Sequence, residues 1–219
     1  GMSRVDSHRH RVVLRNIVVA VFGAAVFLLL VWSYWDAYRS MLGNMRAQAI
    51  EHMEVEYQAL SRSQAQLALQ VYEDELDQPG IRRIMAEAAH TTEADRLAEL
   101  RWQLWQELTP LYERMRRKGF RQLHFHLPGA ISFLRFHRPA KFGDDLWDVR
   151  AGIVRVNIAR EAVSGFEEGR VFNGFRYIFP LMHDGELVGT VEASYSFRSF
   201  LLTHARLDHG AYRLLVSRD

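Results

Sequence analysis

The clearest pattern along the chain is one apolar run near its start. Residues 16–35, NIVVAVFGAAVFLLLVWSYW, contain no charged side chain. At about 1.5 Å of rise per residue, roughly 20 apolar residues in a helix match the hydrocarbon core of a bilayer, which is about 30 Å thick. The pattern therefore predicts that residues 16–35 form a transmembrane helix and anchor the chain in a membrane.

Charged residues flank this run unequally. Residues 1–15 carry four arginines and one aspartate, whereas Asp36 follows the run. The positive-inside rule therefore predicts that residues 1–15 are cytoplasmic and that the chain beyond residue 36 lies on the outer side. One alternative is a cleaved signal peptide, but Trp32, Tyr34 and Trp35 stand where cleavage needs small residues. A buried core helix is the other alternative, and the charge asymmetry argues against it.

The next region has a helical period. Residues 37–77 contain no proline, and a stripe with alternating spacings of four and three indicates a helix that ends at residues 78–80, QPG. This stripe either packs on the chain's own sheet or forms the seam of a homodimer. A second helix is expected to open with a capping box at Thr92 and Asp95 and to stop at Gly119. The first stripe comprises Met53, Tyr57, Leu60, Gln64, Leu67 and Val71, and the second Leu97, Leu100, Leu104, Leu108, Leu111 and Met115.

After Gly119 the period changes to two, which is typical of strands. The segments FRQLHFHL and ISFLRFH flank a turn around Pro128 and Gly129, and together they predict a β-hairpin. If Leu127 pairs with Ser132, the hairpin sorts its side chains into one mostly polar face and one apolar face. The polar face then carries Gln122, His124, His126, Phe133, Arg135 and His137, and the apolar face carries Leu123, Phe125, Leu134 and Phe136.

A second hairpin follows in GFRYIFPLMHDGELVGTVEASYSF, where Asp184-Gly185 is a strong type I′ turn signal. Opposing His183 with Glu186 places Tyr177 across from Glu192 and Arg176 across from Ala193. The 138–170 connection between the hairpins is long enough to suggest a functional role. It is expected to hold a short helix around residues 148–160, and a helix over residues 196–206 and a last strand in AYRLLVS are expected near the end.

Composition narrows the classes of function. The net charge is +2, but residues 1–15 alone contribute +3, so the rest of the chain sums to −1. No basic face remains to follow a phosphate backbone, and we expect no nucleic-acid binding. The chain contains no cysteine, which excludes disulfides, thiolate metal sites and thiol nucleophiles.

Charged and aromatic side chains gather in SFLRFHRPAKFGDDL and in the segments GFEEGR and GFRY. A planar guanidinium matches a carboxylate in a bidentate manner, and an acidic loop side chain can hold an amine. These residues predict a pocket for a small polar or anionic molecule. The alternative is that the same acids and arginines pair with one another and fix the 138–170 connection to the sheet. The candidate ligand-binding residues are Arg135, His137, Asp144, Asp145, Glu167, Arg170, Arg176 and Tyr177.

The sequence does not favour a metal site or an acid/base pair. His124 and His126 lie two apart on a strand with His137 on the same face, but the spacing fixes no additional ligand, so we expect no metal. Asp144 and Asp145 are neighbours whose side chains point apart, which does not suit an acid/base pair. We therefore expect neither a catalytic site nor a cofactor.

The succession FHLP, SFLRFHRPAKFGDDL, VSGFEEGR, GFRYIFPL and GELVGTVEASYSF resembles the extracytoplasmic Cache sensor domains of bacterial membrane receptors, of the double-Cache type. The resemblance covers roughly residues 36–219. It implies an α+β fold in which an N-terminal membrane helix and long helices precede a PAS-like antiparallel sheet, with a small-molecule pocket on one face of that sheet.

The resemblance also implies a function and a location. The expected function is ligand sensing in the periplasm by a receptor of the bacterial inner membrane, of the sensor kinase or diguanylate cyclase type. The expected organisation is a cytoplasmic segment at 1–15, the anchor at 16–35, a helical stalk and helical part of the sensor at 36–119 and the sheet at 120–219. A membrane-tethered interaction or dimerisation module without a small ligand is the alternative function.

Overall fold

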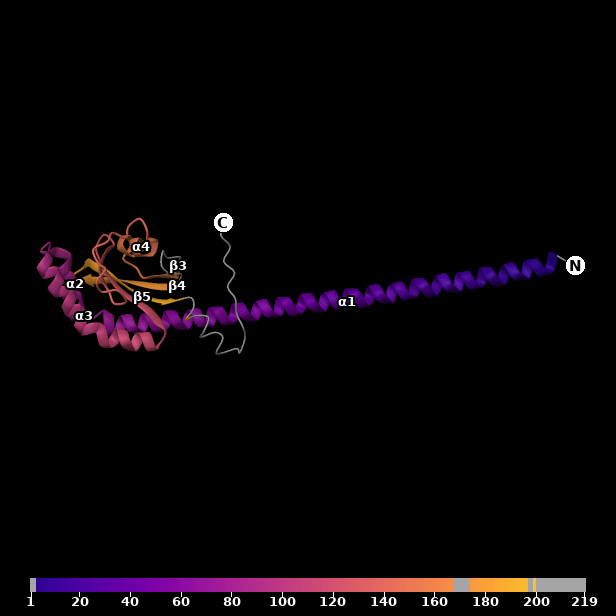
Figure 1. Ribbon diagram of the computed structural model, residues 1–219, viewed down its shortest axis with the longest axis horizontal. Helices are drawn as coiled ribbons and strands as arrows, with labels where there is room; N and C mark the ends of the chain where they lie inside the picture. The colour runs from indigo at the N-terminus through magenta and orange to yellow at the C-terminus, as the bar shows by residue number, and fades with distance from the viewer. Residues whose placement is uncertain (1–2, 168–173, 197–198, 200–219) are drawn as a thin grey trace. The chain divides into compact units, whose positions relative to one another are not determined.

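The computed structural model describes residues 3–167, 174–196 and 199. The chain divides into two compact units, Gly1–Gln58 and Ala59–Asp219, and the division falls inside the first helix, α1 (Ser3–Val71; Figure 1). Arg170, the last strand expected in AYRLLVS and nearly all of the helix expected over 196–206 lie outside the described residues.

In the first unit, α1 contains the expected apolar segment. Its most apolar 18-residue window has a mean hydropathy of 2.5, and none of that window is buried within the chain. By length and composition this helix could cross a membrane. The full exposure of the window argues against a buried core helix.

In the second unit, the last turns of α1 join the core. Ala68 and Val71 are buried, and Leu60 and Leu67 pack against the same cluster. Earlier in the stripe, Met53 is 50% exposed. The stripe therefore packs on the chain's own domain from Leu60 onward.

A five-residue π-helix, η1 (Tyr72–Leu76), follows α1 and leads into α2 (Pro79–His90). The helix α2 was not predicted from the sequence, although Pro79 stands in its first turn, where a proline fits well. The helix α3 (Ala94–Arg117) buries the predicted stripe from Leu100 to Met115, with Leu97 partly buried, and Gly119 follows the helix with φ +92°. The predicted capping box was wrong, because α3 is capped by Glu93 without a side-chain hydrogen bond.

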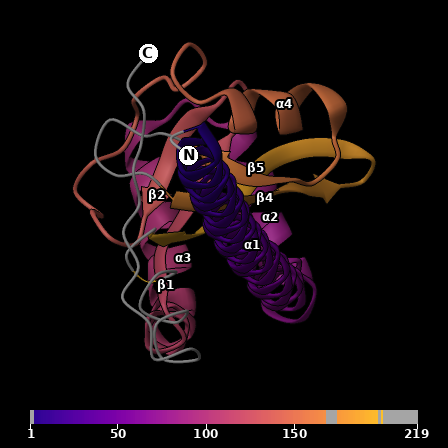
Figure 2. The same ribbon diagram turned by 90° about the vertical axis from the view of Figure 1, so that its right-hand side faces the viewer.

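Within the described part of the chain, the sheet has five antiparallel strands in the order β2-β1-β5-β4-β3. Helices α2 and α3 cover one face and α4 the other, so the unit has three layers (Figure 2). The α4 helix agrees with the helix expected in the connection, whereas β3 was not predicted. The bounds are β1 Phe120–Leu127, β2 Ile131–Arg135, α4 Ala151–Ala159, β3 Val163–Glu167, β4 Gly174–His183 and β5 Glu186–Ser196.

The first hairpin differs from the expected register near its turn. Leu127 pairs with Ile131 and not with Ser132, while Phe125 pairs with Leu134 as expected. The strands accommodate the difference by a bulge, which leaves Phe133 as the extra residue. Phe133 consequently joins the helix-side core. Ser132 takes the place on the polar face that was predicted for Phe133.

The second hairpin has the expected Asp184-Gly185 turn, and His183 pairs with Glu186. Beyond the turn an irregularity between Leu181 and Met182 shifts the register by one residue. The predicted pairs of Tyr177 with Glu192 and of Arg176 with Ala193 were therefore wrong. Tyr177 pairs with Ala193, and Arg176 pairs with Ser194.

Candidate ligand-binding site

Polar side chains occupy the sheet face that looks toward α4 and the 138–150 segment. Because side chains alternate along a strand, the strands that give apolar residues to the helices give polar residues to this face. Its members Gln122, His124, His126, Ser132, Arg135, Arg176, Thr190, Glu192 and Ser194 are all less than a tenth exposed. So many buried polar groups require partners, which the structure largely supplies.

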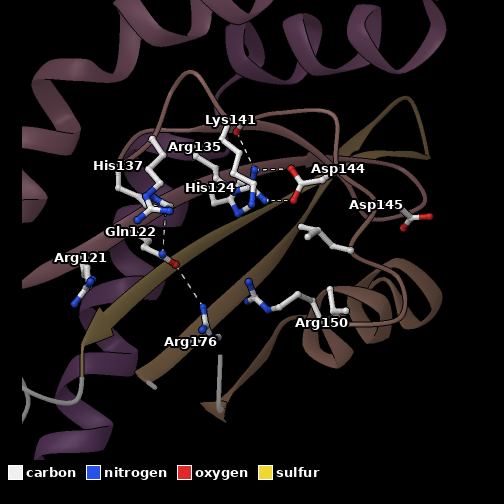
Figure 3. Close-up of a pocket in the computed structure, with 13 residues that line it drawn as sticks. Arg121, Gln122, His124, Arg135, His137, Lys141, Asp144, Asp145, Arg150 and Arg176 are labelled. Atoms are coloured by element: carbon white, nitrogen blue, oxygen red, sulfur yellow. Dashed lines mark hydrogen bonds and ion pairs between the residues drawn. The ribbon is translucent and has the colours of Figure 1, made fainter. Parts of the chain in front are cut away.

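A cavity of about 370 Å³ lies against this face (Figure 3). Strands β1, β2 and β4 and the 138–150 segment contribute to its wall. Cationic side chains outnumber acidic ones among the described lining residues. The cations are Arg121, Arg135, Arg138, Lys141, Arg150 and Arg176; the acids are Asp144 and Asp145; and Gln122, His124, His137, Leu146 and Val149 complete the wall.

Arg135 and Asp144 form a bidentate ion pair at one side of the cavity. The two guanidinium nitrogens of Arg135 donate to the two carboxylate oxygens of Asp144 at 2.6 and 2.7 Å, and one of them also donates to the Lys141 carbonyl at 2.8 Å. The hydrogen bonds from Arg135 lower the pKa of Asp144. This pair holds the connection after β2 onto the strand.

Glu192 is the centre of a second ion-pair network beneath the cavity. It is fully buried, and its two oxygens accept hydrogen bonds from Arg150 and Arg176, each at 2.6 Å. Burial alone would raise the pKa of Glu192, but the charges of Arg150 and Arg176 outweigh it and lower the pKa to about 2. Glu192 is therefore ionised at neutral pH, because paired cations stabilise the charge of a buried carboxylate.

Glu167 on β3 extends this network. One of its oxygens lies 3.3 Å from nitrogens of both Arg150 and Arg176, and the other accepts the backbone N–H of Gly152 at 2.9 Å. A Cβ at Gly152 would overlap Glu167 and Ile178, so the glycine permits this approach. Glu167 thus ties the start of α4 to the sheet.

The histidines of the polar face are held neutral. Burial, reinforced by nearby arginines, lowers the pKa of His137 to about 4 and that of His126 to about 3, and it lowers the pKa of His124 as well. His124 hydrogen-bonds the Ser132 hydroxyl at 2.9 Å, and the Gln122 amide lies 3.0 Å from His137 Nε2. Neutral imidazoles offer directional hydrogen bonds here without adding charge.

The structure brings most of the predicted site residues together. Arg135, His137, Asp144, Asp145 and Arg176 line the cavity, and Glu167 lies behind it. The side chain of Asp145 points away from the arginines in Figure 3, and it accepts the backbone N–H of Trp147 at 2.8 Å. Tyr177 lies in the helix-side core and packs edge-on against Tyr195.

Arg150 and Glu192 were not among the residues predicted for the site. Glu192 carried a signal, because it is the only charged residue in the strand segment VGTVEASYS and a buried charge requires partners. No local sequence pattern indicates that Arg150 reaches the site, since its position at the start of α4 depends on the path of a long connection.

Comparison with known proteins identifies the family. Residues 78–219, more than half of the chain, match the model of the dCache_3 family, which is described as the double sensory domain of two-component sensor kinase. The chain belongs to the dCache_3 family. The resemblance drawn from the sequence is thereby confirmed, and the domain is a sensory, non-catalytic module with an α+β fold.

Solved structures of similar proteins include an extracellular ligand-binding receptor from Desulfohalobium retbaense. It is 18% identical, with a TM-score of 0.42 over 70% of this chain and 27% of that chain. Another is the ligand-binding domain of the Campylobacter jejuni chemoreceptor Tlp3 in complex with 4-methylisoleucine. It is 11% identical, with a TM-score of 0.36 over 64% of this chain and 60% of that chain. A search of curated proteins gives no match.

Proposed function

We propose that this chain is the ligand-sensing region of a bacterial transmembrane receptor of the sensor kinase or diguanylate cyclase type. In this proposal residues 16–35 of α1 anchor it in the inner membrane and the sheet domain lies in the periplasm. The ligand is a small polar or anionic molecule that binds in the cavity against the polar sheet face. Membership of a sensory family and an apolar segment long enough to span a bilayer support the assignment.

One observation carries the choice of ligand class. Six cationic side chains and two carboxylates line the cavity among the described residues; with Glu167 and Glu192, which pair with Arg150 and Arg176, six cations face four acids, and the histidines in the wall are neutral at pH 7. An anion is therefore attracted to the cavity, and an arginine can hold its oxygens in a bidentate manner. A volume of about 370 Å³ is within the usual range for small-molecule sites.

At the cavity wall, an anionic ligand could replace Asp144 as the hydrogen-bond partner of Arg135. Arg135 is held by Asp144, whose side chain is about one-third exposed and belongs to the connection after β2. An anionic ligand that takes over hydrogen bonds from Arg135 would loosen Asp144 and with it this connection. A ligand shifts a conformational equilibrium only by binding one state better than the other. Here the anion would favour the state in which Arg135 is released from Asp144.

Strand β4 offers a route from the cavity to α1. Arg176 faces the cavity, and three residues later Phe179 stacks on Tyr72 with ring centroids 4.4 Å apart. The Tyr72 hydroxyl also donates to the carbonyl of Pro180 at 2.7 Å. Tyr72 is the first residue of η1, directly after α1. We propose that a shift of β4 on ligand binding moves the end of α1 through this contact.

The proposal is tested by ligand binding to the full chain in detergent or nanodiscs. A thermal-shift panel should contain small carboxylates, phosphates, amines and neutral sugars, and calorimetry should give the affinity of each hit. We expect at least one anion to bind. Arg135→Gln should weaken it by roughly 10-fold to 100-fold, as loss of a charge-assisted hydrogen bond predicts.

Two further variants complete this test. Arg138→Gln with Lys141→Gln changes only exposed side chains of the cavity wall. It should weaken binding less than Arg135→Gln, without altering the fold, and reduce the dependence of affinity on salt. The matched control is Arg83→Gln, which lines a different pocket and should bind like the parent. If no anion binds, or if affinity survives all the cavity variants, the proposed ligand class is wrong.

A further inference from the structure

Two histidines and one glutamate meet inside the polar sheet face. His124 and His126 on β1 and Glu192 on β5 each present one ligand atom, and these atoms lie within 4.8 Å of one another. The strand register brings them together, because His124 pairs with Glu192. All three residues are at most 2% exposed. The sequence pointed to the histidines of this face, and the fold places the carboxylate of Glu192 beside two of them.

His126 gives an independent reason to expect an occupant. Its Nδ1 lies 3.0 Å from the Thr190 hydroxyl, whereas its buried Nε2 has no hydrogen-bond partner among the residues that the structure describes. A buried imidazole nitrogen without a partner loses the hydrogen bond that it would make to water in the unfolded chain, which destabilises the fold. A ligand to this nitrogen would remove that destabilisation.

The other hydrogen bonds of the two rings suit metal ligation. In metal sites a ligating histidine usually donates its second N–H to a nearby oxygen, which fixes the tautomer and the ring orientation. Thr190 Oγ1 is placed to accept from His126 Nδ1, and Ser132 Oγ from His124 Nε2. Each ring then keeps one nitrogen lone pair for a metal.

We propose that His124, His126 and Glu192 bind one divalent transition-metal ion, of the zinc, nickel or copper class. Two imidazoles and a carboxylate are a known ligand set for these ions and leave a coordination position open. His124 is shared with the wall of the cavity, so the proposed metal site adjoins the cavity.

The ion pairs around Glu192 set a condition on this site. Each oxygen of Glu192 accepts a hydrogen bond from one arginine and keeps a second lone pair for a metal. Around the cluster, Arg135, Arg150 and Arg176 balance Asp144, Glu167 and Glu192 in formal charge. A dication therefore leaves the region positive, and an anion in the cavity should strengthen metal binding. By linkage, the metal should strengthen anion binding by the same factor.

Metal binding to the full chain, freed of any affinity tag and stripped with chelator, tests the proposal. Co²⁺ is the probe, because its visible spectrum reports coordination and the chain has no cysteine to contribute thiolate bands. We expect one Co²⁺ per chain, displaced by Zn²⁺. His126→Gln and His124→Gln should each weaken Co²⁺ binding by about 100-fold or more. His183→Gln, a histidine at the end of β4 that lies outside the cluster and the cavity wall, should bind Co²⁺ like the parent.

A second measurement keeps the test independent of how well the variants fold. Electron paramagnetic resonance of the parent chain with one equivalent of Cu²⁺ should show two imidazole nitrogens on the metal. Absence of metal binding by the parent, or equal affinity in His126→Gln, would overturn the proposal. A metal that binds in a chain to which no anion binds would support this site and contradict the proposed anionic ligand, so the two failures can be told apart.

Discussion

The two faces of the sheet are built on different principles. The face toward α2 and α3 is apolar, and residues such as Leu123 and Phe125 are fully buried there. The face toward α4 is equally buried but is filled by ion pairs around Glu192 and Arg135. Non-directional apolar packing stabilises the first face, while the second is stable only if each charge keeps its partner. We infer that the first face maintains the fold and the second is available for recognition.

The largest effect that separates the faces is expected from Glu192→Ala. The change leaves Arg150 and Arg176 buried without their shared carboxylate, and breaking a buried pair in this way costs about 3–5 kcal/mol. Denaturant unfolding of the full chain in detergent, followed by circular dichroism, should show this loss. Glu186→Ala, at an exposed position on the same strand, should change stability by less than about 0.5 kcal/mol. Equal losses of stability in Glu192→Ala and Glu186→Ala would contradict the claim that the ion-pair network stabilises the polar face.

On the apolar face, Leu123→Ala should destabilise the domain by about 3 kcal/mol. The side chain is 0% exposed, and its removal loses transfer free energy and leaves a cavity. Because the opposite face is unchanged, the affinity for an anion should remain that of the parent wherever the protein is folded. Leu69→Ala, at a 41% exposed position of α1, is the control for unfolding measurements. A change in affinity with Leu123→Ala would show that the faces are not separable.

Gly152→Ala should have a smaller effect, about 1–3 kcal/mol, which is typical of overpacking. The added methyl group would overlap Glu167 and Ile178 and displace the carboxylate that α4 binds. Thermal unfolding measures the cost. Gly165→Ala, where a Cβ meets nothing within 4 Å, is the matched control on the neighbouring strand. If both variants unfold alike, the Glu167 contact is not required.

The smallest expected effect is a dependence on pH. The pKa of His137 is lowered from about 6.5 to about 4, mainly by burial. Below pH 6.5 the unfolded chain protonates this histidine, whereas the folded chain does so only near pH 4. The contribution of His137 to the free energy of unfolding is therefore full above pH 6.5 and is lost as the pH falls from 6.5 to 4. His137→Gln should reduce, without abolishing, the slope of the unfolding free energy against pH over this window, because the lowered pKa values of His124 and His126 contribute to the same slope. An unchanged slope would show that other groups cause it.

The difference between the faces also explains what could be predicted. Alternation alone placed Leu123, Phe125 and Phe136 on one face and His124 and Arg135 on the other. It failed at Phe133 and at the pairs of Arg176 and Tyr177, because single-residue bulges shift the register and depend on the packing of both strands.

The partners within the polar face could be predicted only in part. The pair of Arg135 with Asp144 was foreseen as an alternative to ligand binding, since both lie in one short segment. The pairing of Glu192 with Arg150 joins residues 42 positions apart across a long connection. No local pattern encodes such a contact, because it depends on where that connection crosses the sheet.

Anion-induced changes in backbone amide shifts, measured by nuclear magnetic resonance on the full chain in nanodiscs, test the central claim most directly. The anion should be the tightest binder from the panel. The account predicts that the largest shifts occur at Gln122, His137 and Lys141 around the cavity, with small shifts at Leu104 and Leu108 in the helix-side core. Shifts concentrated on the helix side, or none at the cavity with saturating anion, would contradict the assignment of the polar face to recognition.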